Sequence, residues 1–147
     1  MLALTKKTGY GLAAMTHLAG LSEGRFVSAR EIAQQIGAPT ALTMNVLKEL
    51  AASGYVKSAR GARGGYRLAR RPENITVANV VGVLEGPVRL AKCVTDATGD
   101  DDECSFHTMA SCPVADPVHR VQRRLRDFLN KVTLAEIVDP LAALART

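Results

Sequence analysis

Residues 28–70, SAREIAQQIGAPTALTMNVLKELAASGYVKSARGARGGYRLAR, decide the fold of this 147-residue chain. The stretch opens on Ser28 and Glu31, spaced so that each side chain can bond the other residue's backbone amide at the start of a helix. This helix is expected to run to about Ile36, because Gly37 readily adopts the left-handed conformation that ends helices. A turn and a second helix then follow.

The second helix of the stretch begins near Pro39, which suits a first helical turn, and ends at Ser53-Gly54. The face expected to be buried is apolar: Leu42, Val46, Leu47 and Leu50. The face expected to point outward is formed by Thr40, Ala41, Met44, Asn45 and Lys48. Two helices joined by a short turn, the second with an open polar face, are typical of helix-turn-helix proteins.

Short extended runs follow these helices. Residues 55–58 and 66–69 are expected to pair as a hairpin around the glycine-rich turn in RGARGGYR, residues 60–67. Tyr66 is expected to pack the hairpin onto the helices. A hairpin after a helix-turn-helix forms a wing, which can lie across a DNA backbone or in the minor groove.

The flanking sequence adds further helices. Residues 3–20 have apolar residues close to helical spacing, and Thr76 can cap a short helix that runs to Leu84. The predicted fold class is therefore mostly α with a small β-hairpin. The predicted parts are a winged helix-turn-helix domain (1–85), a cysteine-bearing loop (86–113), and a dimerisation helix with a C-terminal tail (114–147).

Positive charge gathers on the predicted wing, because no acidic residue occurs between 57 and 71. Such a patch is typical of a surface that binds double-stranded DNA. Asn45 is the expected base reader, since its amide can pair bidentately with adenine. The other expected DNA contacts are Thr40, Lys48, Arg60, Arg63 and Arg67. A solvated basic turn without a DNA contact is the alternative.

Charge also divides the chain. Residues 1–92 hold 13 Lys and Arg against 5 Asp and Glu, whereas residues 93–147 hold 6 against 9.

Lys6 and Lys7 interrupt what would be the apolar stretch of a signal peptide, and no run approaches the roughly 20 apolar residues of a membrane span. We therefore expect a cytoplasmic protein with no membrane contact, whose cysteines stay reduced.

The cysteines are Cys93, Cys104 and Cys112, in the spacing C-x10-C-x7-C. The acidic run 100–103 directly before Cys104 disfavours a reactive thiolate, which argues against thiol catalysis. A cationic metal among the sulfurs tolerates such neighbours. Tight zinc sites usually use closer cysteine pairs, whereas iron–sulfur clusters accept varied spacing. An iron–sulfur cluster is favoured over three cysteines with no shared role.

A long helix is expected from Asp116 as its N-cap, with Pro117 at the first helical position. Its apolar residues step by 3, 4, 3 and 4 positions: Val118, Val121, Leu125, Phe128 and Val132. This stripe is expected to form a homodimer, because a winged-helix reader usually covers two half-sites about 34 Å apart. A stripe packed on its own domain is the alternative. Thr133 starts a last short helix.

Several stretches resemble the Rrf2 family of winged-helix iron–sulfur regulators, typified by IscR, NsrR and RirA. They are LTKKTGYGLAAMTHLA, RGARGGYRLAR, the three cysteines before a long helix, and FLNKVTLAEI. The resemblance covers nearly the whole chain, and ECSFHTMASCPV is similar to the branch that regulates the SUF cluster-assembly operon. It implies a homodimeric repressor or activator whose DNA affinity depends on the presence of a cluster.

The same resemblance makes the three cysteines cluster ligands but supplies no fourth ligand. An IscR-like histidine would fall at Ala115, and an NsrR-like aspartate at about Gly9. His107 and Glu103 are local candidates, and an iron atom open to solvent or to a small thiol is equally compatible. Both a 2Fe-2S and a 4Fe-4S cluster are left open.

Cluster binding is expected to order residues 93–112 and to set the angle of the long helix, and so the spacing of two reading helices. Iron–sulfur, redox or nitric oxide status would then control promoters. One alternative is a winged-helix regulator without a cluster, controlled by thiol oxidation or a partner protein. Another is a small iron–sulfur redox protein that docks an acidic partner. An enzyme is not expected, because no paired nucleophile and base, phosphate loop or metal-hydrolase motif occurs.

Overall fold

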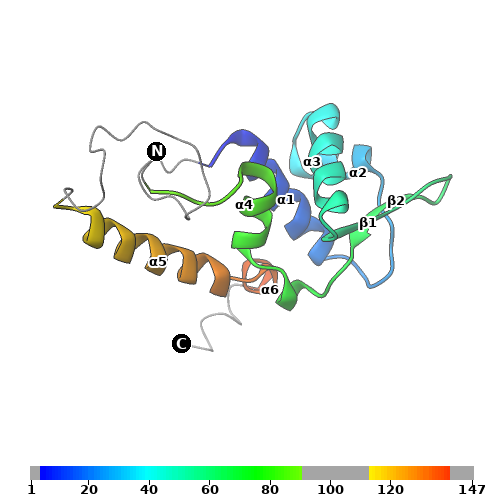
Figure 1. Cartoon of the computed structure of the whole chain (residues 1–147). Helices are drawn as coiled ribbons and strands as arrows, with labels where there is room; N and C mark the ends of the chain where they lie inside the picture. The colour runs from blue at the N-terminus through cyan, green and yellow to red at the C-terminus, as the bar shows by residue number, and fades with distance from the viewer. Residues whose placement is uncertain (1–3, 91–112, 140–147) are drawn as a thin grey trace.

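A computed structural model describes residues 4–90 and 113–139. The described elements are, in order, α1 (Lys6–Ala19), α2 (Ala29–Ile36), α3 (Thr40–Ala52), β1 (Val56–Ala59), β2 (Gly65–Leu68), η1 (Pro72–Asn74), α4 (Val77–Glu85), α5 (Ala115–Lys131) and α6 (Leu134–Val138). The hairpin β1–β2 projects from one end of the molecule, and α5 extends toward the other (Figure 1). This arrangement confirms the predicted mostly helical fold with a winged helix-turn-helix.

The start and end of α2 agree with the sequence pattern in all but one detail. The Ser28 hydroxyl accepts a hydrogen bond from the Glu31 amide at 3.1 Å, and Gly37 ends the helix with φ 68°. The Glu31 carboxylate pairs with the Arg25 guanidinium, at 3.3 Å, rather than with the Ser28 amide. A charged guanidinium is the stronger donor, which explains the difference.

Two helix starts differ slightly from expectation. Pro39 is the N-cap of α3 instead of a residue of its first turn. Helix α5 has Val114 as its N-cap, so Asp116 and Pro117 lie inside its first turn. First-turn amides have no partner within a helix, so proline fits there, and the Asp116 carboxylate is favoured near the positive end of the helix dipole.

The wing is held to the helices through its second strand. Its register pairs Val56 with Leu68, Lys57 with Arg67, Ser58 with Tyr66 and Ala59 with Gly65. Tyr66 also exchanges two backbone hydrogen bonds with Val27, at 2.7 and 3.0 Å, and its side chain packs against the core as expected. A Cβ atom at Gly65 would lie 2.3 Å from the Val27 carbonyl oxygen, so this close approach requires glycine.

Helix α1 lies at the centre and contacts α2, α3, α4 and α6. The largest fully buried apolar side chains of the core include Met15, Ile32, Leu47, Leu50, Ile75 and Leu134. Gly11 explains how α1 and α4 come so close, because a Cβ atom there would lie 2.3 Å from Cδ1 of Leu84. The glycines that weaken the helix pattern of residues 3–20 therefore include one that packing requires.

Helix α6 connects the C-terminal part to the winged domain. Thr76 and Thr133 cap α4 and α6 as the sequence predicts, and the two residues form an isolated antiparallel bridge. The Leu134 amide also donates to the carbonyl of Ile75 at 2.9 Å. The end of α5 is thus fastened to the start of α4.

Candidate nucleic-acid interface

The outward face of α3 is polar. Its exposed residues include Thr40, Ala41, Met44, Asn45 and Lys48, as expected. The opposite face is buried through Val46, Leu47 and Leu50. Thr43 is buried too, because its hydroxyl donates to the carbonyl of Pro39 at 3.0 Å. The face that is left open therefore carries exposed polar side chains, including Thr40, Asn45 and Lys48.

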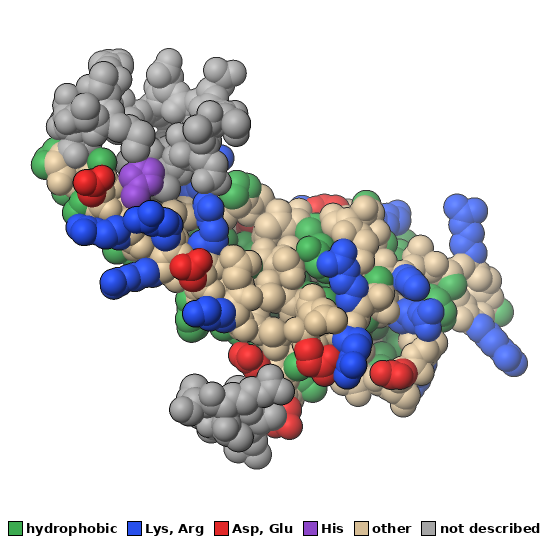
Figure 2. Space-filling view, turned by 60° about the horizontal axis from the view of Figure 1, so that its bottom comes forward, with side chains coloured by type: hydrophobic (Ala, Val, Ile, Leu, Met, Phe, Trp, Pro, Cys, Tyr) green, Lys and Arg blue, Asp and Glu red, His purple; other side chains and the backbone are tan. Residues whose placement is uncertain are grey.

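The wing presents arginines at its turn. Arg60 and Arg63 are exposed between β1 and β2. In the space-filling view, Lys and Arg side chains extend from the hairpin end and also follow α5 (Figure 2). An exposed arginine at the tip of a hairpin can reach a phosphate or a narrow minor groove.

Arg67 is placed differently from the arginines of the turn. Its side chain is half-buried, and its guanidinium carbon lies 4.8 Å from the centre of the Phe26 ring. Its Nε is buried and has no hydrogen-bond partner among the described residues. Arg70 makes a similar stack on Tyr55, at 4.7 Å. The predicted contact of Arg67 with DNA stays a prediction.

The start of α1 is bound to the end of α4. The Glu85 carboxylate accepts hydrogen bonds from the Thr5 amide at 3.0 Å and from the hydroxyls of Thr5 and Thr8. These hydroxyl bonds, that of Thr5 foremost, hold the pKa of Glu85 below its ordinary value. Sequence reasoning missed this contact, since its partners are about 80 residues apart.

Lys7 links the same helices to α3. Its Nζ lies 2.8 Å from the Glu49 carboxylate on α3 and donates to the carbonyl of Leu84 at 3.4 Å. One side chain of α1 therefore contacts both α3 and the last turn of α4.

Gln122 fastens the segment after α4 to α5. The Leu90 amide donates to its Oε1 at 2.8 Å, and its side-chain amide donates to the carbonyl of Val88. Sequence reasoning missed Gln122, although a polar residue beside the apolar stripe of an amphipathic helix is a signal for it. The chain that leads toward the cysteines is therefore held at Gln122 and at Glu85.

The apolar stripe of α5 is only partly covered. Val118, Leu125 and Val132 are half-buried, whereas Val121 and Phe128 are 54% and 61% exposed. Val114, seven residues before Val121, is 56% exposed. One edge of the stripe therefore packs on its own chain, and the other edge is open.

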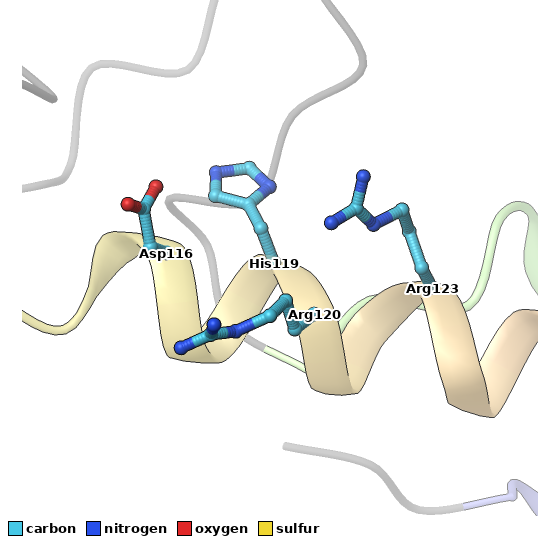
Figure 3. A pocket seen from close by; sticks show the side chains of 4 residues that line it. All are labelled: Asp116, His119, Arg120 and Arg123. Carbon is cyan, nitrogen blue, oxygen red and sulfur yellow. The ribbon is translucent and has the colours of Figure 1, made fainter.

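A shallow pocket of about 540 Å³ lies beside the first turns of α5. It is lined by Asp116, His119, Arg120 and Arg123. Figure 3 shows Asp116, His119 and Arg123 on one side of the helix, with Arg120 lying along the face nearest the viewer. These four residues of the described part include one carboxylate, Asp116, and one imidazole, His119.

The predicted metal ligands Cys93, Cys104, Cys112 and His107 lie outside the described residues. Within residues 4–90 and 113–139, no three His, Cys, Asp or Glu side chains come together as a metal site would need. Gly9 is exposed on α1 with room for a side chain, and Ala115 begins α5. Neither Gly9 nor Ala115 has a side-chain atom that could coordinate a metal.

None of the helices in the described part combines the length and hydropathy of a membrane span.

The Rrf2 family model, described as an iron-dependent transcriptional regulator, matches residues 4–140. The chain is also similar to CymR of B. subtilis, described as its global cysteine regulator, with 28% identity and a TM-score of 0.76 over 94% of this chain and 97% of that one.

IscR of T. potens is 30% identical, with a TM-score of 0.70 over 95% of this chain and 88% of that one. The oxidised form of Staphylococcus aureus CymR, 23% identical, shares the fold with a TM-score of 0.69 over 94% and 97% of the two chains. The family model thus spans the winged domain, the cysteine-bearing residues and the long helix. The chain belongs to the Rrf2 family of DNA-binding transcriptional regulators.

Proposed function

We propose that this chain is a homodimeric regulator whose affinity for a double-stranded operator depends on an iron–sulfur cluster held by Cys93, Cys104 and Cys112. One observation carries the proposal. The segment that leads to the cysteines is fastened to α1 through Glu85 and to α5 through Gln122. A change in the cysteine-bearing residues would therefore act on both the reading domain and the long helix.

The proposed DNA contacts come from α3 and the wing. Asn45 would read a base, and Thr40 and Lys48 would position the helix on the duplex, which their exposure on α3 supports. Arg60 and Arg63 would contact phosphates or the minor groove. Arg67 would add positive charge at the base of the wing.

The proposed dimer uses the open edge of α5. Val114, Val121 and Phe128 are spaced by seven residues and more than half exposed, as in the seam of a helix pair. Val118, Leu125 and Val132 would complete the stripe. Two copies related by a two-fold axis would present two α3 helices to successive half-sites.

The donor set fits the proposed cofactor, because three thiolates are soft ligands that iron–sulfur clusters use. His107 is the local candidate for a fourth donor, and a 2Fe-2S or a 4Fe-4S cluster would suit the set. When bound, the cluster supplies a centre that responds to iron supply, oxidants or nitric oxide. Such a regulator suits the control of cluster-assembly genes, and it would act in the cytoplasm, where the chromosome lies.

The proposed coupling passes through α1. Lys7 contacts both the Leu84 carbonyl on α4 and Glu49 on α3, so a shift of the segment after α4 would reach the reading helix. A coupling of about 1–3 kcal/mol would change DNA affinity roughly 5- to 150-fold.

Anaerobic purification tests the proposal. We expect brown protein with iron and sulfide, bleached by Cys93→Ala, Cys104→Ala or Cys112→Ala, whereas the control Ser105→Ala keeps its colour. Wild-type holo and apo protein should differ in their affinity for the DNA upstream of the gene, measured by gel shift. Metal-free protein with equal operator affinity before and after cysteine substitution would reject cluster-dependent control.

A second candidate is a regulator without a cluster, controlled by thiol oxidation or by a partner protein. The absence of a ligand side chain at Gly9 and Ala115 favours it. Colourless protein that still shifts DNA, with an affinity that changes after treatment with peroxide and recovers with dithiothreitol, would support this candidate.

A further inference from the structure

A cavity of about 660 Å³ lies between the end of α1, residues 21–25 and the hairpin. Lys57 and Arg67, which are directly paired across β1 and β2, both line it. Its volume falls in the range of pockets for small molecules. Arg67 is the one proposed DNA contact among the described lining residues.

Positive charge dominates this cavity. Its described lining holds five basic residues, Arg25, Lys57, Arg67, Arg70 and Arg71, against the two acidic residues Glu23 and Glu73. Arg71 pairs with Glu73 at 3.4 Å, and Arg25 pairs with Glu31. Among the described residues, no carboxylate pairs with Lys57 or Arg67. A bound anion would offset the electrostatic repulsion between Lys57 and Arg67.

Arg67 is the most specific feature of the cavity. The Phe26 ring holds its guanidinium plane, while its buried Nε has no acceptor. The Nε is closed to solvent, so an anion in the cavity would be bound by the outer nitrogens of the guanidinium, which have no acceptor among the described residues. A guanidinium edge matches the two oxygens of a carboxylate or a phosphate.

We propose that this cavity binds a small organic anion. Its carboxylate or phosphate would accept hydrogen bonds from Arg67 and Lys57, and its carbon skeleton would contact Leu18, Leu21 and Leu68, which line the same cavity. A DNA backbone also offers phosphate oxygens, but it has no apolar part for these leucines. Because Arg67 lies on β2 of the wing, binding of the anion would change the position of the wing. This inference is independent of the proposed cluster.

Titration calorimetry on the full-length protein tests the site, with inorganic phosphate and succinate as probes at constant ionic strength. We expect saturable binding of both probes, weakened at least tenfold by Arg67→Gln. Arg30→Gln, which removes the same charge from an exposed position of α2 outside the cavity, should bind as the wild type does. Lys57→Gln, at an exposed position, should weaken binding about threefold or more and serves if Arg67→Gln does not fold.

Three results would overturn the proposal. The first is the absence of saturable binding by the wild type, and the second is equal weakening by Arg30→Gln, which would indicate general charge screening. The third is an Arg67→Gln protein that keeps its affinity for the probes but loses affinity and salt dependence on duplex DNA, which would assign Arg67 to DNA phosphate. Cys104→Ala should bind the probes unchanged, so failure of the cluster proposal is measured separately.

Discussion

The Leu90 amide donates to Oε1 of Gln122 at 2.8 Å, and this contact joins the segment after α4 to the middle of α5. Gln122 is 2% exposed, and its side-chain amide also donates to the carbonyl of Val88. A primary amide offers an acceptor and a donor in one plane, so it pairs with a backbone N–H and a backbone C=O at once. Gln122 therefore fixes the position of residues 88–90 along α5.

Replacing Gln122 by Leu should leave the Leu90 amide and the Val88 carbonyl unpaired. We expect the free energy of unfolding to fall by about 1–3 kcal/mol, the usual cost of unsatisfied buried groups. Urea denaturation measures the loss, and hydrogen exchange at Leu90 should become faster. Asn130→Leu is the control, since Asn130 is exposed on the same helix and its replacement should cost at most about 0.5 kcal/mol. Equal stability of the two variants would show that this contact contributes nothing.

Two glycines of α1 should respond in opposite directions to alanine. At Gly11 the new Cβ would lie 2.3 Å from Leu84 Cδ1 and 3.3 Å from Val46 Cγ1, so Gly11→Ala should destabilise the protein by about 1–3 kcal/mol. At Gly9 nothing lies within 4 Å, and Gly9→Ala should stabilise the helix by up to about 1 kcal/mol. Thermal denaturation checks both changes. A stabilising Gly11→Ala would mean that α1 and α4 are further apart than described.

Glu85 should make folding dependent on pH. Its pKa in the folded protein lies below the ordinary value of 4.5, so its ionised form favours the folded state. The contribution is complete well above the ordinary pKa of 4.5 and is lost as pH falls through the folded pKa. The stability difference between wild type and Glu85→Gln should therefore be constant near neutral pH and shrink below pH 4.5. Urea denaturation between pH 3 and 7 measures it, with Glu73→Gln as the control at an exposed carboxylate. A difference that does not change with pH would contradict the assignment.

The sequence was sufficient at three helices that begin with a capping hydroxyl, but not at α5, whose N-cap is Val114 rather than Asp116. Ser28, Thr76 and Thr133 cap the helices they were expected to cap, because a hydroxyl at that position meets an unpaired amide nearby. The burial of Arg67 and the backbone partners of Gln122 could not be predicted, since both depend on segments distant in the chain. A pattern of charges does not reveal which arginine stacks on an aromatic ring.

Two substitutions should separate base reading from phosphate contact in the proposed complex. Arg63→Ala should weaken binding to all duplexes alike and lower the slope of log affinity against log salt by about 0.9. Asn45→Ala should cost about 1–3 kcal/mol on the operator, with little effect on unrelated DNA and an unchanged salt slope. Fluorescence anisotropy at several salt concentrations measures both. An Arg63→Ala protein with unchanged affinity and slope would exclude the wing from the contact.

Phe128 should be the main aromatic contact of the proposed dimer. It is 61% exposed on the open edge of α5, and aromatic side chains in the middle of an interface commonly contribute about 2 kcal/mol each. A symmetric dimer contains two copies, so Phe128→Asp should raise the dimer dissociation constant at least about 100-fold. Analytical ultracentrifugation measures this change, and operator affinity should fall with it. Asn130→Asp adds the same charge at an exposed position of α5 outside the stripe and should remain dimeric. If Phe128→Asp stays dimeric, the two copies meet through another surface, because an unpaired carboxylate buried in an apolar seam would not be tolerated.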